Sequence, residues 1–135
     1  LRGNCEELIM IAGGSGLAPI RSLVYDVIEK GRDDLKMRFF FGANTMRDFY
    51  YMEEFARIEK EHPNFSFIPC LAFPKPEDNW KGAEGFVTVA LQEQVQNGEN
   101  REAYLCGSPG MLDACIRILK EKGFTDRTIF FDKFT

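Results

Sequence analysis

Residues 8–20 read LIMIAGGSGLAPI, and this stretch decides the fold that the sequence predicts. Its apolar start is typical of a buried strand, and a segment with helical spacing follows the glycines. A dinucleotide-binding loop of the form G-x-G-x-x-G would have a third glycine where this chain has Pro19. Because proline is tolerated in the first turn of a helix, Pro19 favours the start of the helix there. The turn, which either holds a nucleotide phosphate or is tight without any ligand, comprises Gly13, Gly14, Ser15 and Gly16.

The same alternation of strand and helix continues along the chain. Apolar runs predict strands at residues 6–12, 35–43, 64–72, 101–107 and 127–134. Helical spacing predicts helices at residues 18–31, 47–62, 85–98 and 111–123. The sequence therefore predicts an α/β fold: a doubly wound, five-stranded parallel sheet with helices on both faces. Ligands of such sheets bind at the carboxyl ends of the strands, so the loops there are the candidate sites.

Composition excludes several classes of function. The chain has 135 residues, of which 44% are hydrophobic, and a net charge of −4, which fits one folded domain without a nucleic-acid partner. No apolar stretch is long enough to span a membrane. The four cysteines lack the spacing of a zinc or iron–sulfur site, so no metal is predicted, and Cys70 and Cys115 are expected to be buried thiols. The only histidine, His62, is expected at a solvated helix end.

A second glycine-rich turn, CGSPGM, follows the fourth predicted strand. Gly107 and Gly110 allow a sharp turn there, and Pro109 is placed to begin the next helix. If the first and fourth strands are neighbours, the two glycine-rich turns lie side by side. Two such turns at one edge of a sheet favour a nucleotide site over an empty turn.

Five segments together resemble the pyridine-nucleotide domain of flavoenzymes of the ferredoxin–NADP⁺ reductase type. They read GGSGLAPI, FGANTMRDFYYMEEF, PEDNWKGAEGF, YLCGSPGM and FFDKF, and they cover essentially the whole chain in order. The first loop of that family is G-x-G-x-x-P, so Pro19 belongs to the pattern. Within the family, the PEDNW segment and the FFDKF ending look most like the F subunit of the sodium-translocating NADH:quinone oxidoreductase, and reductases of bacterial monooxygenases come next.

The resemblance implies roles for individual residues. Cys106 and Gly107 would lie near the nicotinamide and the flavin, with Met111 lining that pocket, and Phe134 would cover the flavin ring. Read from the residues alone, Cys106 is an ordinary cysteine at a strand end and Phe134 a last core residue. The residues expected to contact the pyrophosphate and nicotinamide side of the nucleotide, or to shape the second turn, are Gly13, Gly14, Ser15, Gly16, Pro19, Ser108 and Pro109.

The segment after the third strand favours NADH over NADPH. NADPH enzymes of the family usually have Ser-Arg there, whereas this chain has Ala-Phe-Pro, and Phe73 is expected to flank the adenine. Acidic residues in the following loop would repel a 2′-phosphate. Trp80, in the same loop, either covers the nucleotide or anchors the loop. Weaker candidates for contacts with the ribose or adenine are Asn44, Asp48 and Glu77.

The resemblance also implies what lies outside the chain. The R-x-Y-[ST] motif of the FAD-binding barrel is absent, so residues 1–135 are expected to be the NAD(P)H-binding domain of a larger flavoprotein whose barrel binds FAD. The parent would pass hydride from NADH to FAD and electrons onward to a quinone. The electrons would travel through a 2Fe–2S ferredoxin domain and membrane subunits. The parent is expected in the cytoplasm or at the inner face of the membrane. The alternatives are the reductase component of a bacterial oxygenase and, from another class, a nucleotide-sensing regulatory module.

Overall fold

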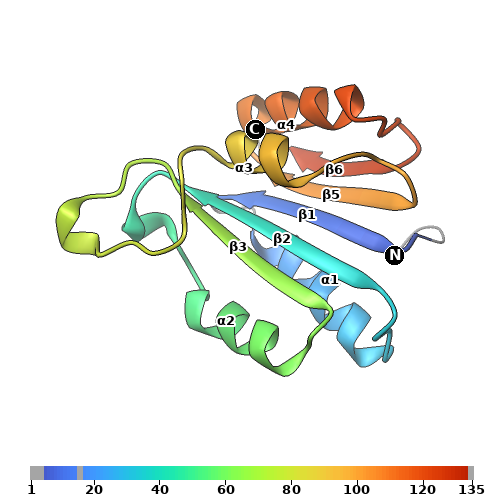
Figure 1. The fold of residues 1–135 in the computed structure, drawn as a ribbon, viewed down its shortest axis with the longest axis horizontal. Helices are drawn as coiled ribbons and strands as arrows, with labels where there is room; N and C mark the ends of the chain where they lie inside the picture. Colours follow the sequence, from blue (N-terminus) through green and yellow to red (C-terminus); the bar gives the residue numbers. More distant parts are fainter. Residues whose placement is uncertain (1–4, 15–16, 134–135) are drawn as a thin grey trace.

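A six-stranded parallel sheet forms the centre of the molecule (Figure 1). The computed structural model describes residues 5–14 and 17–133. In chain order the strands are β1 (Glu7–Gly13), β2 (Lys36–Ala43), β3 (Phe65–Leu71), β4 (Ala83–Glu84), β5 (Arg101–Gly107) and β6 (Ile129–Lys133). They lie in the order β4-β3-β2-β1-β5-β6. The chain builds outward from β1 to β4 and then returns to the other side of β1, so the direction of winding switches between β1 and β5. Ligands of such sheets bind beside this switch.

Helices cover both faces of the sheet, as Figure 1 shows. They are α1 (Leu17–Glu29), α2 (Met52–Glu61), α3 (Val87–Gln94) and α4 (Pro109–Glu121). The first two pack on one face and the last two on the other. Two 3₁₀ turns, Met46–Asp48 and Pro76–Asp78, lie in the loops after β2 and β3. The α/β class, the parallel sheet and the helices on both faces are confirmed.

Strand periodicity divides the interior into two cores. In β2, Phe39 and Phe41 point toward α1 and α2, and Phe40 points toward α3 and α4. All three rings are fully buried. Because successive side chains of a strand alternate between faces, the apolar runs fill both compartments at once. We call these compartments the α1–α2 core and the α3–α4 core.

The predicted number of five strands is wrong, because the sheet has six. The additional strand, β4, consists of two residues within the long loop after β3. It pairs in parallel with the end of β3, through Cys70 with Ala83 and Leu71 with Glu84. A strand of two residues has no measurable periodicity, which is why the sequence pattern did not reveal it.

Two helices are shorter than predicted. The second begins at Met52, because the Asp48 carboxylate turns back to accept a hydrogen bond from the Thr45 amide (3.2 Å) and closes a separate turn. Tyr51 then adopts a left-handed conformation (φ 59°) just before the helix. The third helix ends at Gln94 rather than at residue 98, since Val95 is already extended.

The remaining structural predictions concern cysteines, histidine and membrane segments. Cys70 and Cys115 are buried free thiols, as predicted, and His62 is the residue that caps α2 at its carboxyl end. In the part of the chain that the structure describes, no helix has both the length and the apolar composition to span a membrane. Across the same residues, no three side chains of the metal-binding types gather into a site.

A largely buried carboxylate joins three strands at the amino end of the sheet. The Glu7 side chain contacts Arg38 on β2, with 2.9 Å between Oε2 and Nε. Its other oxygen lies 2.6 Å from Nε of Arg101 on β5. Burial alone would raise the pKa of Glu7, but the hydrogen bonds from the two arginines hold it below its usual value. This ion triad lies at the amino ends of the strands, whereas the glycine-rich turns follow their carboxyl ends.

Candidate nucleotide-binding site

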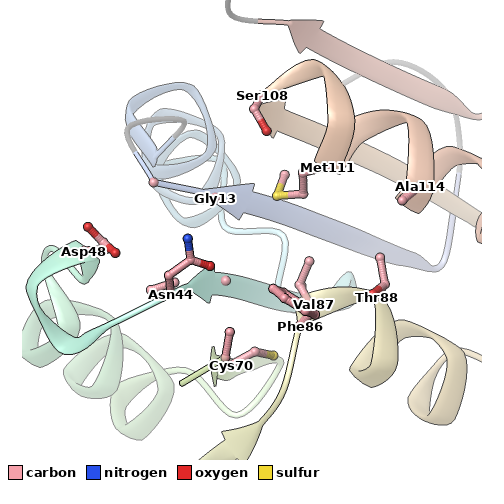
Figure 2. A pocket seen from close by; sticks show the side chains of 14 residues that line it. Gly13, Asn44, Asp48, Cys70, Phe86, Val87, Thr88, Ser108, Met111 and Ala114 are labelled. Carbon is pink, nitrogen blue, oxygen red and sulfur yellow. The ribbon is translucent and has the colours of Figure 1, made fainter. Parts of the chain in front are cut away.

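A cleft of about 650 Å³ opens at the carboxyl ends of β1, β2 and β3. Figure 2 shows side chains reaching it from both sides, with those that follow β2 facing those at the start of α4. The lining residues are Gly13, Gly14, Gly42, Ala43, Asn44, Asp48, Cys70, Ala72, Phe86, Val87, Thr88, Ser108, Met111 and Ala114. Its size is within the usual range for small-molecule sites.

The two glycine-rich turns meet at one end of this cleft. A β-carbon added to Gly107 would lie 3.6 Å from the backbone nitrogen and oxygen of Gly13, so the two backbones run side by side. Met111 packs across both: a β-carbon on Gly107 would lie 2.6 Å from its Cε, and one on Gly13 would overlap its sulfur. Figure 2 shows Met111 extending from α4 beside the end of β1. We call this junction the glycine seam; a β-carbon on either glycine would force the end of the Met111 side chain to move.

The ends of three helices make this edge of the sheet suitable for phosphate. α1 begins just after the first turn, α4 begins at Pro109 directly after the second, and α3 begins at Val87 in the cleft wall. The amino end of a helix presents free amides and a partial positive charge. Gly14 has a left-handed backbone (φ 55°), and the space around its α-carbon is open. Because Gly14 has no side chain and nothing crowds its α-carbon, a pyrophosphate can approach the backbone at this residue.

Asn44 and Asp48 follow β2 on the side of the cleft opposite to α4. The Asp48 carboxylate is fixed by the Thr45 amide and by the Thr45 hydroxyl, whose oxygen lies 3.3 Å from Oδ2. Asn44 is exposed, and its backbone carbonyl accepts a hydrogen bond from the Phe73 amide. None of the described residues that line the cleft is a lysine or an arginine. These residues therefore offer no cationic side chain to a second phosphate group.

Trp80 anchors the long loop between β3 and α3. Its ring stacks on Phe49 with 5.3 Å between centroids, and its indole N–H donates to the Ala83 carbonyl at 2.8 Å. The Gly85 amide donates to the Leu71 carbonyl, which fixes the end of the loop to β3. Of the two roles considered for Trp80, the contacts support that of loop anchor.

An aromatic pair at the ends of this loop borders the cleft. Phe73 and Phe86 meet edge to face, with centroids 5.7 Å apart and planes at 90°. They are 57% and 55% exposed, which is unusual for phenylalanine. Phe86 lines the cleft, and Phe73 supports it from outside. The sequence reasoning missed Phe86, although its place between a glycine and a helix start was a usable signal.

Cys106 does not line the cleft. Its side chain belongs to the α1–α2 core, whereas Met111 packs against the α3–α4 core. Together with Pro19 and Asp132, Cys106 lines a second groove of about 610 Å³ between α1 and the strands β5 and β6. Burial, and then the nearby Asp132 carboxylate, raise the pKa of the Cys106 thiol. The thiol is therefore neutral at physiological pH and can donate a hydrogen bond.

Six of the predicted site residues line the cleft, and the other predicted residues that the structure describes do not. The predicted residues that line the cleft are Gly13, Gly14, Asn44, Asp48, Ser108 and Met111. Gly107 is buried at the seam, Pro109 is exposed at the start of α4, and Glu77 is exposed in the turn after β3. Three predicted residues lie outside the described ranges: Ser15, Gly16 and Phe134.

Comparison with known proteins agrees with this geometry. The family model described as the oxidoreductase NAD-binding domain matches residues 10–117. The chain is 39% identical to the F subunit of the Na⁺-translocating NADH-quinone reductase of Pseudoalteromonas atlantica, over 95% of this chain and 32% of that protein. It is also 39% identical to the F subunit of the same reductase of Methylococcus capsulatus, over 98% of this chain and 34% of that protein. The chain thus spans about a third of the length of the curated relatives that it matches.

Solved structures share the fold. The cytochrome P450 reductase GcoB of Amycolatopsis superimposes with a TM-score of 0.84 at 31% identity, over 96% of this chain and 38% of that one. The cytochrome b5 reductase domain of Ulva prolifera nitrate reductase gives a TM-score of 0.86 at 26% identity, over 98% of this chain and 50% of that one. In both cases the match covers only a part of the larger reductase.

Proposed function

The chain belongs to the oxidoreductase NAD-binding domain family, and on that premise we propose that it is the NADH-binding domain of a flavin-dependent reductase. The observation that carries the proposal is the glycine seam, where two backbones without side chains meet beside the starts of α1 and α4. Backbone amides of Gly13, Gly14 and Ser108 would hold the pyrophosphate, and Phe86 would take the adenine at the other end of the cleft.

The chemistry that bound NADH supplies is hydride transfer from its nicotinamide to a flavin held by another domain. The task of this chain is to bind and orient the dinucleotide and to exclude water from the reacting ring. Cys106 lies at the carboxyl end of β5, on the side of β1 away from β3, and we expect the nicotinamide to extend from the cleft toward it. Its neutral thiol would contact the ring without acting as a nucleophile.

The similarity to the F subunit of the quinone reductase favours a parent that reduces a quinone. Such a parent would contribute an FAD-binding barrel, a 2Fe–2S ferredoxin domain and contacts with membrane subunits at the inner face of the membrane, and residues 1–135 would form one domain of it. The similarity to a cytochrome P450 reductase favours a second candidate, the reductase component of an oxygenase. The chain's place in either parent is the same, because both use NADH to reduce a flavin.

Titration calorimetry of the chain with NADH tests the proposal. We expect saturable binding to one site. NAD⁺ and ADP-ribose should compete with NADH, because the proposed contacts are to the pyrophosphate and the adenosine, which all three molecules share. A chain that is folded by circular dichroism and binds none of the three would contradict the proposal. Reduction of the flavin in the full-length parent by NADH then tests the redox role.

Phe86→Ala is expected to weaken NADH binding about tenfold, because stacking of a base on an aromatic ring contributes roughly 1–3 kcal/mol. Calorimetry with NADH and with AMP measures the change, and both ligands should lose affinity equally. Val89→Ala is the control: Val89 is 45% exposed on α3, three residues after Phe86, and does not line the cleft. Equal losses in the two variants would argue against a direct contact of Phe86 with the base.

Cys106→Ala is expected to leave the affinity for NADH unchanged and to slow flavin reduction in the parent by about 10- to 100-fold, because poor alignment of two reacting rings has an effect of this size. Stopped-flow absorbance of the flavin gives the rate at saturating NADH. Cys5→Ala is the control, since Cys5 lies at the other end of the chain and lines neither groove. An unchanged rate in Cys106→Ala would reject the role.

A further inference from the structure

Three acidic residues follow β2 and β3, and the structure distinguishes one of them. Asp48 lines the cleft, whereas Glu77 and Asp78 do not. The Asp78 carboxylate accepts a hydrogen bond from the Lys75 amide at 2.8 Å, within the exposed turn of the long loop. Of the three, Asp48 is therefore the one placed in the cleft wall, and the other two lie outside the lining.

The Asp48 carboxylate is held in place rather than mobile. Its Oδ2 accepts hydrogen bonds from both the amide and the hydroxyl of Thr45, and the side chain is half-buried. The neighbouring Arg47 is exposed and does not line the cleft. A negative charge is therefore fixed at the cleft wall, with no cation from the described lining residues beside it.

Asp48 lines the cleft between the glycine seam and the aromatic pair. The glycine seam lies at the end of β1, and the aromatic pair lies beyond β2, at the ends of the loop that follows β3. Asp48 follows β2, the strand between them. If the pyrophosphate occupies the seam and the adenine contacts Phe86, the ribose that joins them lies beside β2.

We propose that Asp48 makes this cleft selective for NADH over NADPH, by accepting hydrogen bonds from the ribose hydroxyls and repelling a 2′-phosphate. The inference rests on the proposed function, since it needs a dinucleotide in the cleft. A phosphate monoester carries a charge of about −1.5 to −2 at neutral pH. At hydrogen-bond distance, repulsion between this group and a carboxylate lowers affinity about tenfold or more even at high dielectric constant.

Asp48→Asn tests the proposal, because the amide oxygen of asparagine can still accept the Thr45 hydrogen bonds while the charge is lost. Calorimetry of the chain with NADH and with NADPH gives the ratio of the two affinities. We expect the ratio of NADPH to NADH affinity to rise at least tenfold in the variant. Raising the salt concentration should relax the discrimination of the wild-type chain and leave that of the variant nearly unchanged. A role of Asp48 only in the turn would not produce this salt effect.

Two further variants remove the same charge elsewhere. Glu53→Gln changes an exposed side chain of α2, outside the cleft, and should leave the ratio unchanged. If Glu77→Gln raises the ratio and Asp48→Asn does not, the long loop selects the cofactor and the inference is overturned. If the wild-type chain binds NADH and rejects NADPH but all three variants behave like it, the inference fails while the proposed function stands. A wild-type chain that binds neither nucleotide overturns both.

Discussion

Replacing Glu7 by alanine is expected to lower the free energy of unfolding by about 3–5 kcal/mol, because removal leaves two largely buried guanidinium groups without their shared carboxylate. The Glu7 side chain is 11% exposed and those of Arg38 and Arg101 are 19% and 21% exposed, so water cannot fully replace the lost contacts. For a chain of this length the loss corresponds to a fall of about 10–20 °C in melting temperature. Urea unfolding at pH 7 measures the change directly.

An exposed ion pair provides the control for Glu7. Asp34→Ala removes the partner of Arg32, where Asp34 is 74% exposed, and should have an effect below about 1 kcal/mol. The pH dependence gives a second readout. Because the folded pKa of Glu7 lies below its unfolded value, its contribution is complete above the unfolded pKa and is lost as the pH falls through the folded one. Wild-type and variant stabilities should therefore converge in acid, and a difference that stays constant as the pH falls through this range would contradict the ion triad as the cause.

Gly13→Val is expected to lower the affinity for NADH about a hundredfold. A β-carbon there overlaps the Met111 sulfur, so the methionine must swing away, and the two valine methyls then occupy the seam. Each charge-assisted hydrogen bond lost to the pyrophosphate costs about 1.5–3 kcal/mol, and about 1.4 kcal/mol is a factor of ten. The displaced side chain should also reduce stability by about 1–3 kcal/mol. Calorimetry and thermal unfolding separate the two effects.

The double variant Gly13→Val/Met111→Ala separates steric strain from blocked binding. Removing the methionine side chain relieves the overlap, so stability should recover relative to Gly13→Val. The valine methyls still fill the seam, so the affinity for NADH should remain low. If the double variant binds NADH as the wild-type chain does, the seam does not hold the nucleotide.

Much of the fold followed from the sequence because long apolar strands carry a strong periodic signal. The run from Phe39 to Phe41 predicted a strand buried on both faces, and the structure places it there. The signal failed where an element is short or where a side chain redirects the backbone. β4 has only two residues, and the turn closed by Asp48 delays α2, a local hydrogen bond that helical spacing cannot reveal.

The site was predicted in its glycines and less well in its side chains. Glycine spacing identified both turns, since the backbone freedom of glycine depends only on the residue type. The prediction grouped Cys106 with Met111, but strand alternation turns Cys106 toward α1, while Met111 approaches from α4 on the other face. Phe73 was named without Phe86, because their contact depends on the path of the long loop, which Trp80 anchors. The roles of these residues in catalysis and binding stay predictions.

The separation of the interior into two cores has a practical consequence for engineering. Three residues that line the cleft also pack in the α3–α4 core: Cys70, Val87 and Met111. None of the described lining residues belongs to the α1–α2 core. Substitutions far apart and without shared neighbours have nearly additive effects. A more heat-resistant variant can thus be sought by repacking the side of α1 and α2 near Val27, Leu35 and Ile58, while cofactor preference is altered independently across the sheet.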